Sequence, residues 1–277
     1  MNRNISDLKR EFGNLIQEVD TAVRPLIDSI DIQAISKHNA GYMRYGTDKF
    51  RYFVESEKNR FIKALDIILR DRRQGVVCDI GCFIPYVPVA LSLLGYNVRV
   101  VDNYDFYGSR FKESILAFSQ THRLSLFDLD IIQNDLDLLG KNDIVLLMAV
   151  VEHFHGTPQF LFNKIHKLLN EGGKLLFEVP NIAALNKRFR MLLGHSPLAD
   201  YSDYFHSSYP FTGHNREMTV AEVRYLFHQA GLRIEHLECY DYEDAKNIQW
   251  RGKLVRFLRA IIPSKNTGQS ILVKAVV

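Results

Sequence analysis

The chain has 277 residues, of which 47% are hydrophobic and 24% charged, so it is long enough for one large α/β domain with a buried core. Its 35 basic and 32 acidic residues leave a formal net charge of +3, an excess too small to indicate nucleic acid as a partner. The N-terminus lacks the apolar stretch of a secretory signal, and the three cysteines form no disulfide framework. These features predict a cytoplasmic protein.

Two helical patterns come before any β pattern. Between residues 5 and 26, apolar residues recur at alternating steps of three and four, which places one apolar seam on a helix. We favour packing of this seam against the rest of the chain, and a homodimer formed through it is the alternative. A second helix is expected from 48 to about 72, so residues 1–72 are interpreted as an N-terminal helical cap.

From residue 76 onward, short β-rich runs alternate with helical ones. This alternation is typical of a doubly wound α/β fold, in which helices cover a mostly parallel sheet of seven strands, here over residues 73–277. The expected strands are 76–80, 97–102, 130–133, 143–149, 174–179, 232–238 and 270–276. The expected helices fall near 86–94, 109–120, 158–170 and 219–230.

A long segment at about 180–218 interrupts this pattern, and we expect it to be a lid, because loops of such length in compact domains are usually functional. Its aromatic side chains can either stack on a ring of a substrate or form the core of the lid; they are Tyr201, Tyr204, Phe205, Tyr209 and Phe211. A basic amphipathic helix at 247–262 packs on the sheet or the lid, or touches a membrane surface peripherally. The longest apolar run, 144–151, is too short for a membrane span.

The turn after the first strand and the end of the second strand carry the strongest functional signal. Ligands of doubly wound sheets bind at the carboxyl ends of the strands. Gly81 allows a tight turn and the close approach of a ligand, and Asp102 can accept the hydroxyls of a ribose. Asp79 disfavours a pyrophosphate, and Phe83 and Pro85 replace the small residues that a dinucleotide loop needs. The pattern favours a cationic nucleoside, S-adenosylmethionine, over NAD.

These segments resemble the motifs of class I S-adenosylmethionine-dependent methyltransferases over about residues 76–277. The segments that carry the resemblance are 76–82, 100–103, 132–136, 143–154 and 168–181. The resemblance implies a Rossmann-like sheet with strand order 3-2-1-4-5-7-6, an antiparallel last strand, S-adenosylmethionine as donor and S-adenosylhomocysteine as product. It also implies the cofactor-binding residues Asp79, Gly81, Cys82, Phe83, Asp102, Asn103, Asp135, Leu136 and Ala149.

The segment 213–219 is similar to methyltransferases of cell-surface glycan and small-metabolite pathways. The chain is therefore expected to methylate an oxygen or nitrogen atom of a small molecule or glycan, such as a sugar, a lipid-linked glycan or a secondary metabolite. An RNA or protein acceptor ranks lower, because a strongly basic face is missing.

Histidine suits proton removal from the acceptor, because its pKa lies near neutrality. His153 follows the fourth strand and is the first candidate, and Glu152 beside it can orient the ring or the substrate. Further candidates are His155, His206 and His214. Related quinone-pathway methyltransferases bind a divalent metal with the help of an additional glutamate, three residues before the Glu-His pair, where Ala149 stands here. No metal is predicted, because Glu152 and His153 alone supply too few ligands of the oxygen-rich kind that a hard cation prefers.

An alternative function is a catalytically degenerate methyltransferase-like scaffold that binds a protein partner. The first motif of the family usually has glycine where Phe83 stands, and often where Pro85 stands. The apolar seam at 5–26 would then serve association.

Overall fold

The computed structural model describes residues 5–44, 46–71, 74–242 and 266–277. Seven strands form one sheet in the order β3-β2-β1-β4-β5-β7-β6, in which β7 is antiparallel to both neighbours and the other pairs are parallel. The strands are β1 (Val76–Ile80), β2 (Asn97–Asp102), β3 (Leu124–Asp128), β4 (Asn142–Met148), β5 (Leu169–Pro180), β6 (Arg233–Tyr240) and β7 (Ser270–Val276). The predicted fold class and strand order are confirmed.

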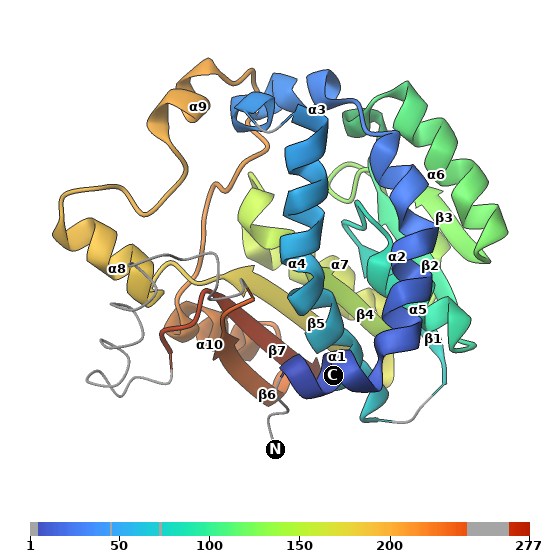
Figure 1. Ribbon diagram of the computed structural model, residues 1–277. Coiled ribbons are helices and arrows are strands. Elements are labelled where there is room, and N and C mark those ends of the chain that lie inside the picture. The colour runs from blue at the N-terminus through green and yellow to red at the C-terminus, as the bar shows by residue number, and fades with distance from the viewer. Residues whose placement is uncertain (1–4, 45, 72–73, 243–265) are drawn as a thin grey trace.

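Helices cover both faces of this sheet (Figure 1). The N-terminal helices are α1 (Ile5–Glu11), α2 (Gly13–Asp28), α3 (Ile32–His38), η1 (Ala40–Arg44) and α4 (Gly46–Leu69). Those between the strands are α5 (Tyr86–Leu93), η2 (Tyr104–Tyr107), α6 (Ser109–Thr121), η3 (Asp137–Leu139), η4 (Val151–His153) and α7 (Pro158–Leu168). After β5 come α8 (Leu185–Leu192), α9 (Tyr201–His206) and α10 (Val220–Gln229). One apolar core joins α2, α4, α5 and α6 to the sheet, and a second joins α7 and α10 to its other face.

The apolar seam of the first helix packs inside the chain. Its residues Val19, Val23 and Leu26 are buried in the core that includes α5 and β1. The expected continuous helix at 5–26 is divided, because α1 ends at Glu11 and α2 begins at Gly13. The division into a cap at 1–72 and a domain at 73–277 stays a prediction.

One predicted strand is wrong. Residues 130–133 form a turn, in which the Asp130 carboxylate accepts hydrogen bonds from the backbone N–H groups of Ile132 (2.8 Å) and Gln133 (3.2 Å). Side-chain capping of this kind stabilises a turn and competes with a strand ladder. The third strand lies earlier, at Leu124–Asp128, where it pairs with β2.

The insert after β5 contacts the N-terminal helices at the top of Figure 1, where α9 lies beside η1. The backbone N–H groups of Ser208 and Thr212 donate to the carbonyls of Lys37 and His38, both at 2.9 Å. The hydroxyl of Ser207 accepts a hydrogen bond from the N–H of Ala40. Residues 37–40 and the insert therefore pack against each other.

Two findings bear on the membrane predictions. The predicted helix at 247–262 lies outside the described residues. Within the described part of the chain, no helix combines enough length with enough apolar character to cross a bilayer.

Candidate functional site

The turn after β1 requires glycine for two independent reasons. Gly81 has a φ of +76°, a backbone conformation that residues other than glycine rarely adopt. A Cβ atom built at Gly81 would also lie 2.4 Å from Cγ2 of Val150, so the turn runs directly against the segment that follows β4. The N–H groups of Gly81 and Cys82 donate to the carbonyl of Val101 at 2.8 and 3.2 Å. The ends of β1, β2 and β4 thus meet at one place.

Two carboxylates, Asp79 and Asp102, lie at the ends of β1 and β2. Burial raises the pKa of Asp79 to about 7, and the charge of Asp102 adds to this, whereas a hydrogen bond with Cys82 lowers it. Burial also raises the pKa of Asp102 to about 7. Among the described residues, neither carboxylate forms an ion pair with lysine or arginine. A positively charged ligand would therefore be stabilised at this edge of the sheet.

Two groups hydrogen-bond to the Asp102 carboxylate. The Tyr107 hydroxyl donates to Oδ2 of Asp102 at 3.1 Å, and the Asn103 N–H donates to Oδ1 at 2.7 Å. The Tyr107 ring stacks on Phe83, with 4.3 Å between centroids and 18° between planes. Phe83 also contacts Phe111 of α6, and its side chain is partly buried. Tyr107 was missed by the sequence analysis.

The other predicted cofactor-binding residues do not all lie beside the Gly81 turn and Asp102. Ala149, at the end of β4, has a φ of +56°, and its N–H donates to the carbonyl of Glu178 at 2.9 Å. Such strained backbone is concentrated at functional sites. Asp135 is exposed, and its carboxylate accepts a hydrogen bond from the N–H of Asp137. It lines a surface pocket with Leu136 and Lys164, apart from the Gly81 turn.

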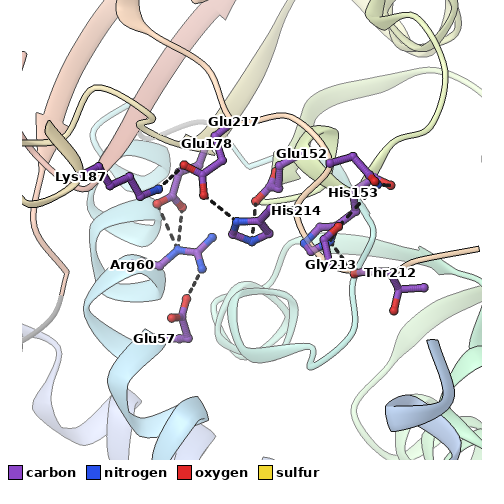
Figure 2. Close-up of polar contacts among 11 residues, drawn as sticks. Glu57, Arg60, Glu152, His153, Glu178, Lys187, Thr212, Gly213, His214 and Glu217 are labelled. Carbon is purple, nitrogen blue, oxygen red and sulfur yellow. Dashed lines mark hydrogen bonds and ion pairs between the residues drawn. The ribbon is translucent and has the colours of Figure 1, made fainter. Parts of the chain in front are cut away.

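Three predicted catalytic residues do lie together. Glu152 and His153 are in η4, directly after β4, and His214 comes from the insert. The rings of His153 and His214 meet edge to face with centroids 4.9 Å apart, and Nε2 of His214 is 4.0 Å from Oε1 of Glu152 (Figure 2). His155 and His206 are exposed and hydrogen-bond to carbonyls elsewhere in the insert.

Burial sets the charge states of this cluster. It lowers the pKa of His153 to about 4, and the neighbouring His214 charge lowers it further, so His153 is neutral near pH 7. Burial raises the pKa of Glu152 to about 7, against the opposing effect of His214. A neutral imidazole beside a carboxyl group near its titration midpoint can accept or relay a proton.

A buried ion-pair network from α4 borders the cluster. Arg60 of α4 pairs with Glu57 and, at 3.1 Å, with Glu178 of β5, which also accepts a hydrogen bond from Tyr240 at 2.7 Å. Although burial opposes it, the charges of Glu178 and Glu57 raise the pKa of Arg60 above its usual value. Figure 2 shows Arg60 and Glu178 beside the His214 side of the cluster. The sequence did contain a signal for this network, because Glu178 is an acidic residue within an otherwise apolar strand.

Comparison with known proteins assigns the chain to a family. The profile of a family described as "Methyltransferase domain" matches residues 50–237, more than half of the chain. The chain belongs to this methyltransferase domain family. The predictions of a Rossmann-like methyltransferase and of an enzyme are confirmed by this match and by the strand order.

Individual relatives of this methyltransferase are distant. Over 180 residues it is 22% identical to a ubiquinone biosynthesis O-methyltransferase from Rickettsia canadensis, covering 63% of this chain and 69% of the relative. Its fold resembles magnesium protoporphyrin IX methyltransferase from Synechocystis PCC 6803 with bound SAH, with TM-score 0.51, 14% identity and coverage of 80% and 83%. An S-adenosylmethionine-dependent methyltransferase from Mesorhizobium loti gives TM-score 0.51, 17% identity and coverage of 80% and 98%.

Proposed function

We propose that this methyltransferase transfers the methyl group of S-adenosylmethionine to an oxygen or nitrogen atom of a small-molecule or glycan acceptor. The observation that carries the proposal is the pair of carboxylates, Asp79 and Asp102, beside the Gly81 turn without a cationic partner among the described residues. The donor carries a sulfonium and an ammonium group, which fit this charge, and it supplies an electrophilic methyl group. Asp102 binds its ribose hydroxyls and Asp79 its cationic end.

The acceptor binds between η4, the insert and α4. In-line transfer requires the nucleophile to approach the methyl group closely in a site that excludes water. His153 lies in η4, just after β4, and His214 comes from the insert beside it. Either ring can take the proton of an acceptor hydroxyl, and Glu152 can orient the acceptor. The distant relative named as an O-methyltransferase supports an oxygen acceptor.

Exposed aromatic side chains of the insert support an acceptor with a ring. Tyr201, Phe205 and Tyr209 are 75%, 70% and 91% exposed, so they are not a lid core. Phe211, by contrast, is buried and meets Tyr204 edge to face. Large exposed aromatic faces are suited to stacking on a sugar or heterocyclic ring.

The proposal places the enzyme in the cytoplasm, supported by three cysteines that are all free thiols. Nucleic acid is not proposed as a partner, because the net charge is only +3. A homodimer through the N-terminal helix stays a prediction, and the burial of Val19, Val23 and Leu26 inside the chain favours the intramolecular role of the seam.

The test of the donor site is Asp102→Asn. Loss of a charge-assisted pair of hydrogen bonds should weaken S-adenosylhomocysteine binding by about ten- to a hundredfold in titration calorimetry. Asp105→Asn is the matched control, because it removes an exposed carboxylate three residues away that pairs with Lys112. Equal affinity of Asp102→Asn and the control would place the donor elsewhere.

A second candidate function is a partner-binding scaffold, and the Tyr107 hydroxyl on Asp102 is the observation that favours it. A protein that binds its ligand at a hundred times the Kd gains about 2.7 kcal/mol of stability. A melting temperature unchanged in millimolar S-adenosylmethionine or S-adenosylhomocysteine would support the scaffold against the enzyme.

A further inference from the structure

Glu152, His153 and His214 present a set of ligand atoms to one point. One ligand atom from each residue lies within 4.8 Å of the other two, and Figure 2 shows the three side chains grouped between η4 and the insert. Two of the residues are neighbours in η4, whereas the third is supplied by a segment about sixty positions later. The cluster therefore exists only in the folded chain.

The carboxylate of this cluster is buried, and no side chain or backbone group of another described residue donates a hydrogen bond to it. Glu152 is fully buried, and neither of its oxygens accepts a hydrogen bond from another residue that the structure describes. Arg60, the cation that lies nearby, pairs with Glu57 and Glu178 instead. Leaving a buried carboxyl group unpartnered is costly, so a cation at this point would stabilise it.

Both imidazoles are held in the manner of metal ligands. The Nδ1 of His153 faces the carbonyls of Thr212 (2.8 Å) and Gly213 (3.2 Å), which only accept, so this nitrogen carries the proton and Nε2 holds the lone pair. The Nδ1 of His214 faces Oε1 of Glu217 at 2.9 Å, and Glu217 is paired with Lys187. Metal-bound histidines almost always donate their other N–H to a carbonyl or carboxylate, which fixes the ring.

We propose that Glu152, His153 and His214 bind a divalent transition-metal ion of the zinc type. Two imidazole nitrogens and one carboxylate oxygen suit such an ion better than Mg²⁺ or Ca²⁺, which prefer oxygen ligands. Three protein ligands leave a coordination position open. If the proposed methyl transfer holds, this position receives an oxygen of the acceptor, and the bound ion, in place of the two histidines, promotes its deprotonation. Binding of the ion does not depend on that function. The sequence argument against a metal considered only Glu152 and His153, and the insert adds the third ligand.

The experiment uses the full chain without an affinity tag, stripped of metal and titrated with Zn²⁺ by calorimetry. We expect one equivalent to bind, His214→Ala and His214→Gln to weaken binding by more than about a hundredfold, and Glu217→Gln to weaken it by about tenfold, as removal of an outer partner does. His195→Ala is the matched control, because His195 is an exposed histidine of the same insert. Cobalt replacement should give the visible absorption of a four-coordinate site.

Equal Zn²⁺ affinity of His214→Gln and the control, or the absence of a one-equivalent site, would overturn the proposal. Circular dichroism of each variant separates loss of ligand from loss of fold. Titration of the same proteins with S-adenosylhomocysteine separates this inference from the proposed function. Zn²⁺ binding without S-adenosylhomocysteine binding would support the metal site and contradict the proposed function. S-adenosylhomocysteine binding without Zn²⁺ binding would support the proposed function and contradict the metal site.

Discussion

Tyr107 forms a hydrogen bond with the Asp102 carboxylate, which we expect to bind the donor. Its hydroxyl donates to Oδ2 of Asp102, and its ring is stacked on Phe83, so the two aromatic side chains are coupled. A donor whose ribose hydroxyls bind Asp102 must displace this hydrogen bond. Donor affinity is therefore reduced by whatever free energy the Tyr107 contact contributes.

Tyr107→Phe removes the competing hydroxyl and keeps the stacked ring. We expect S-adenosylmethionine to bind up to about tenfold more tightly, because a hydrogen bond to a charged group contributes roughly 1.5 kcal/mol or more. Calorimetric Kd values of the variant and the native protein test this. Tyr225→Phe, at an exposed position of α10, is the control. A weaker Kd for Tyr107→Phe would show that the hydroxyl binds the donor itself.

The residues of the donor turn differ in how far the sequence could predict them. Gly81 and Asp102 were found because their positions follow from the ends of predicted strands. Tyr107 was not found, since its contact with Asp102 depends on the short helix η2, which has no strong sequence signature. The stacking of Phe83 on Tyr107 depends on the same local turn.

Among the elements, α10 shows how local chemistry fixes a helix start. The Thr219 hydroxyl accepts a hydrogen bond from the N–H of Glu222 (3.2 Å), and the Glu222 carboxylate accepts one from the N–H of Thr219 (2.7 Å). This reciprocal cap was predicted from the sequence because it needs only residues three positions apart. It begins the helix directly after the insert that carries His214.

Thr219→Ala should destabilise the protein by about 1 kcal/mol, the usual effect of losing a cap, and lower the melting temperature by about 2–4 °C. Differential scanning calorimetry measures both. Thr121→Ala is a suitable control, since Thr121 is exposed at the end of α6 and donates only to a carbonyl of its own helix. Equal melting temperatures for the two variants would contradict a stabilising role of the cap.

The element boundaries predicted from periodicity agree with the structure where a strand is fully buried, as for β1 and β4. The third strand was misplaced because residues 130–133 are apolar enough to resemble a strand, whereas the Asp130 side chain stabilises a turn there. The first helix was predicted too long, since an apolar seam does not reveal the break at Phe12.

At the scale of the whole molecule, the acceptor side of the site combines segments that are far apart in the sequence. Arg60 comes from α4, Glu152 from η4, Glu178 from β5 and His214 from the insert (Figure 2). Hydrogen bonds between the segment at the end of α9 and residues of α3 and η1 join the insert to the N-terminal helices. Such long-range convergence depends on packing and was not predictable from one sequence, whereas the strand order followed from a family resemblance.

The carboxylates of Asp79 and Asp102 couple the charge of the donor site to pH. Burial raises the pKa of both Asp79 and Asp102 to about 7, so the folded protein holds protons that the unfolded chain releases between about pH 4 and pH 7. Without donor, the stability contributed by these groups therefore falls as pH rises through that range. A cationic donor reverses this preference, because it binds the ionised carboxylates.

Donor affinity should consequently increase with pH. We expect the Kd of S-adenosylmethionine to fall by up to about tenfold per pH unit for each carboxylate between pH 5.5 and 7, and to level off above pH 8. Calorimetry near pH 6.5 in two buffers of different ionisation enthalpy should detect proton release on binding. S-adenosylhomocysteine, which lacks the sulfonium charge, should show a smaller dependence, and Asp102→Asn should reduce the released protons. A Kd independent of pH over this range would mean that the two carboxylates do not face the donor.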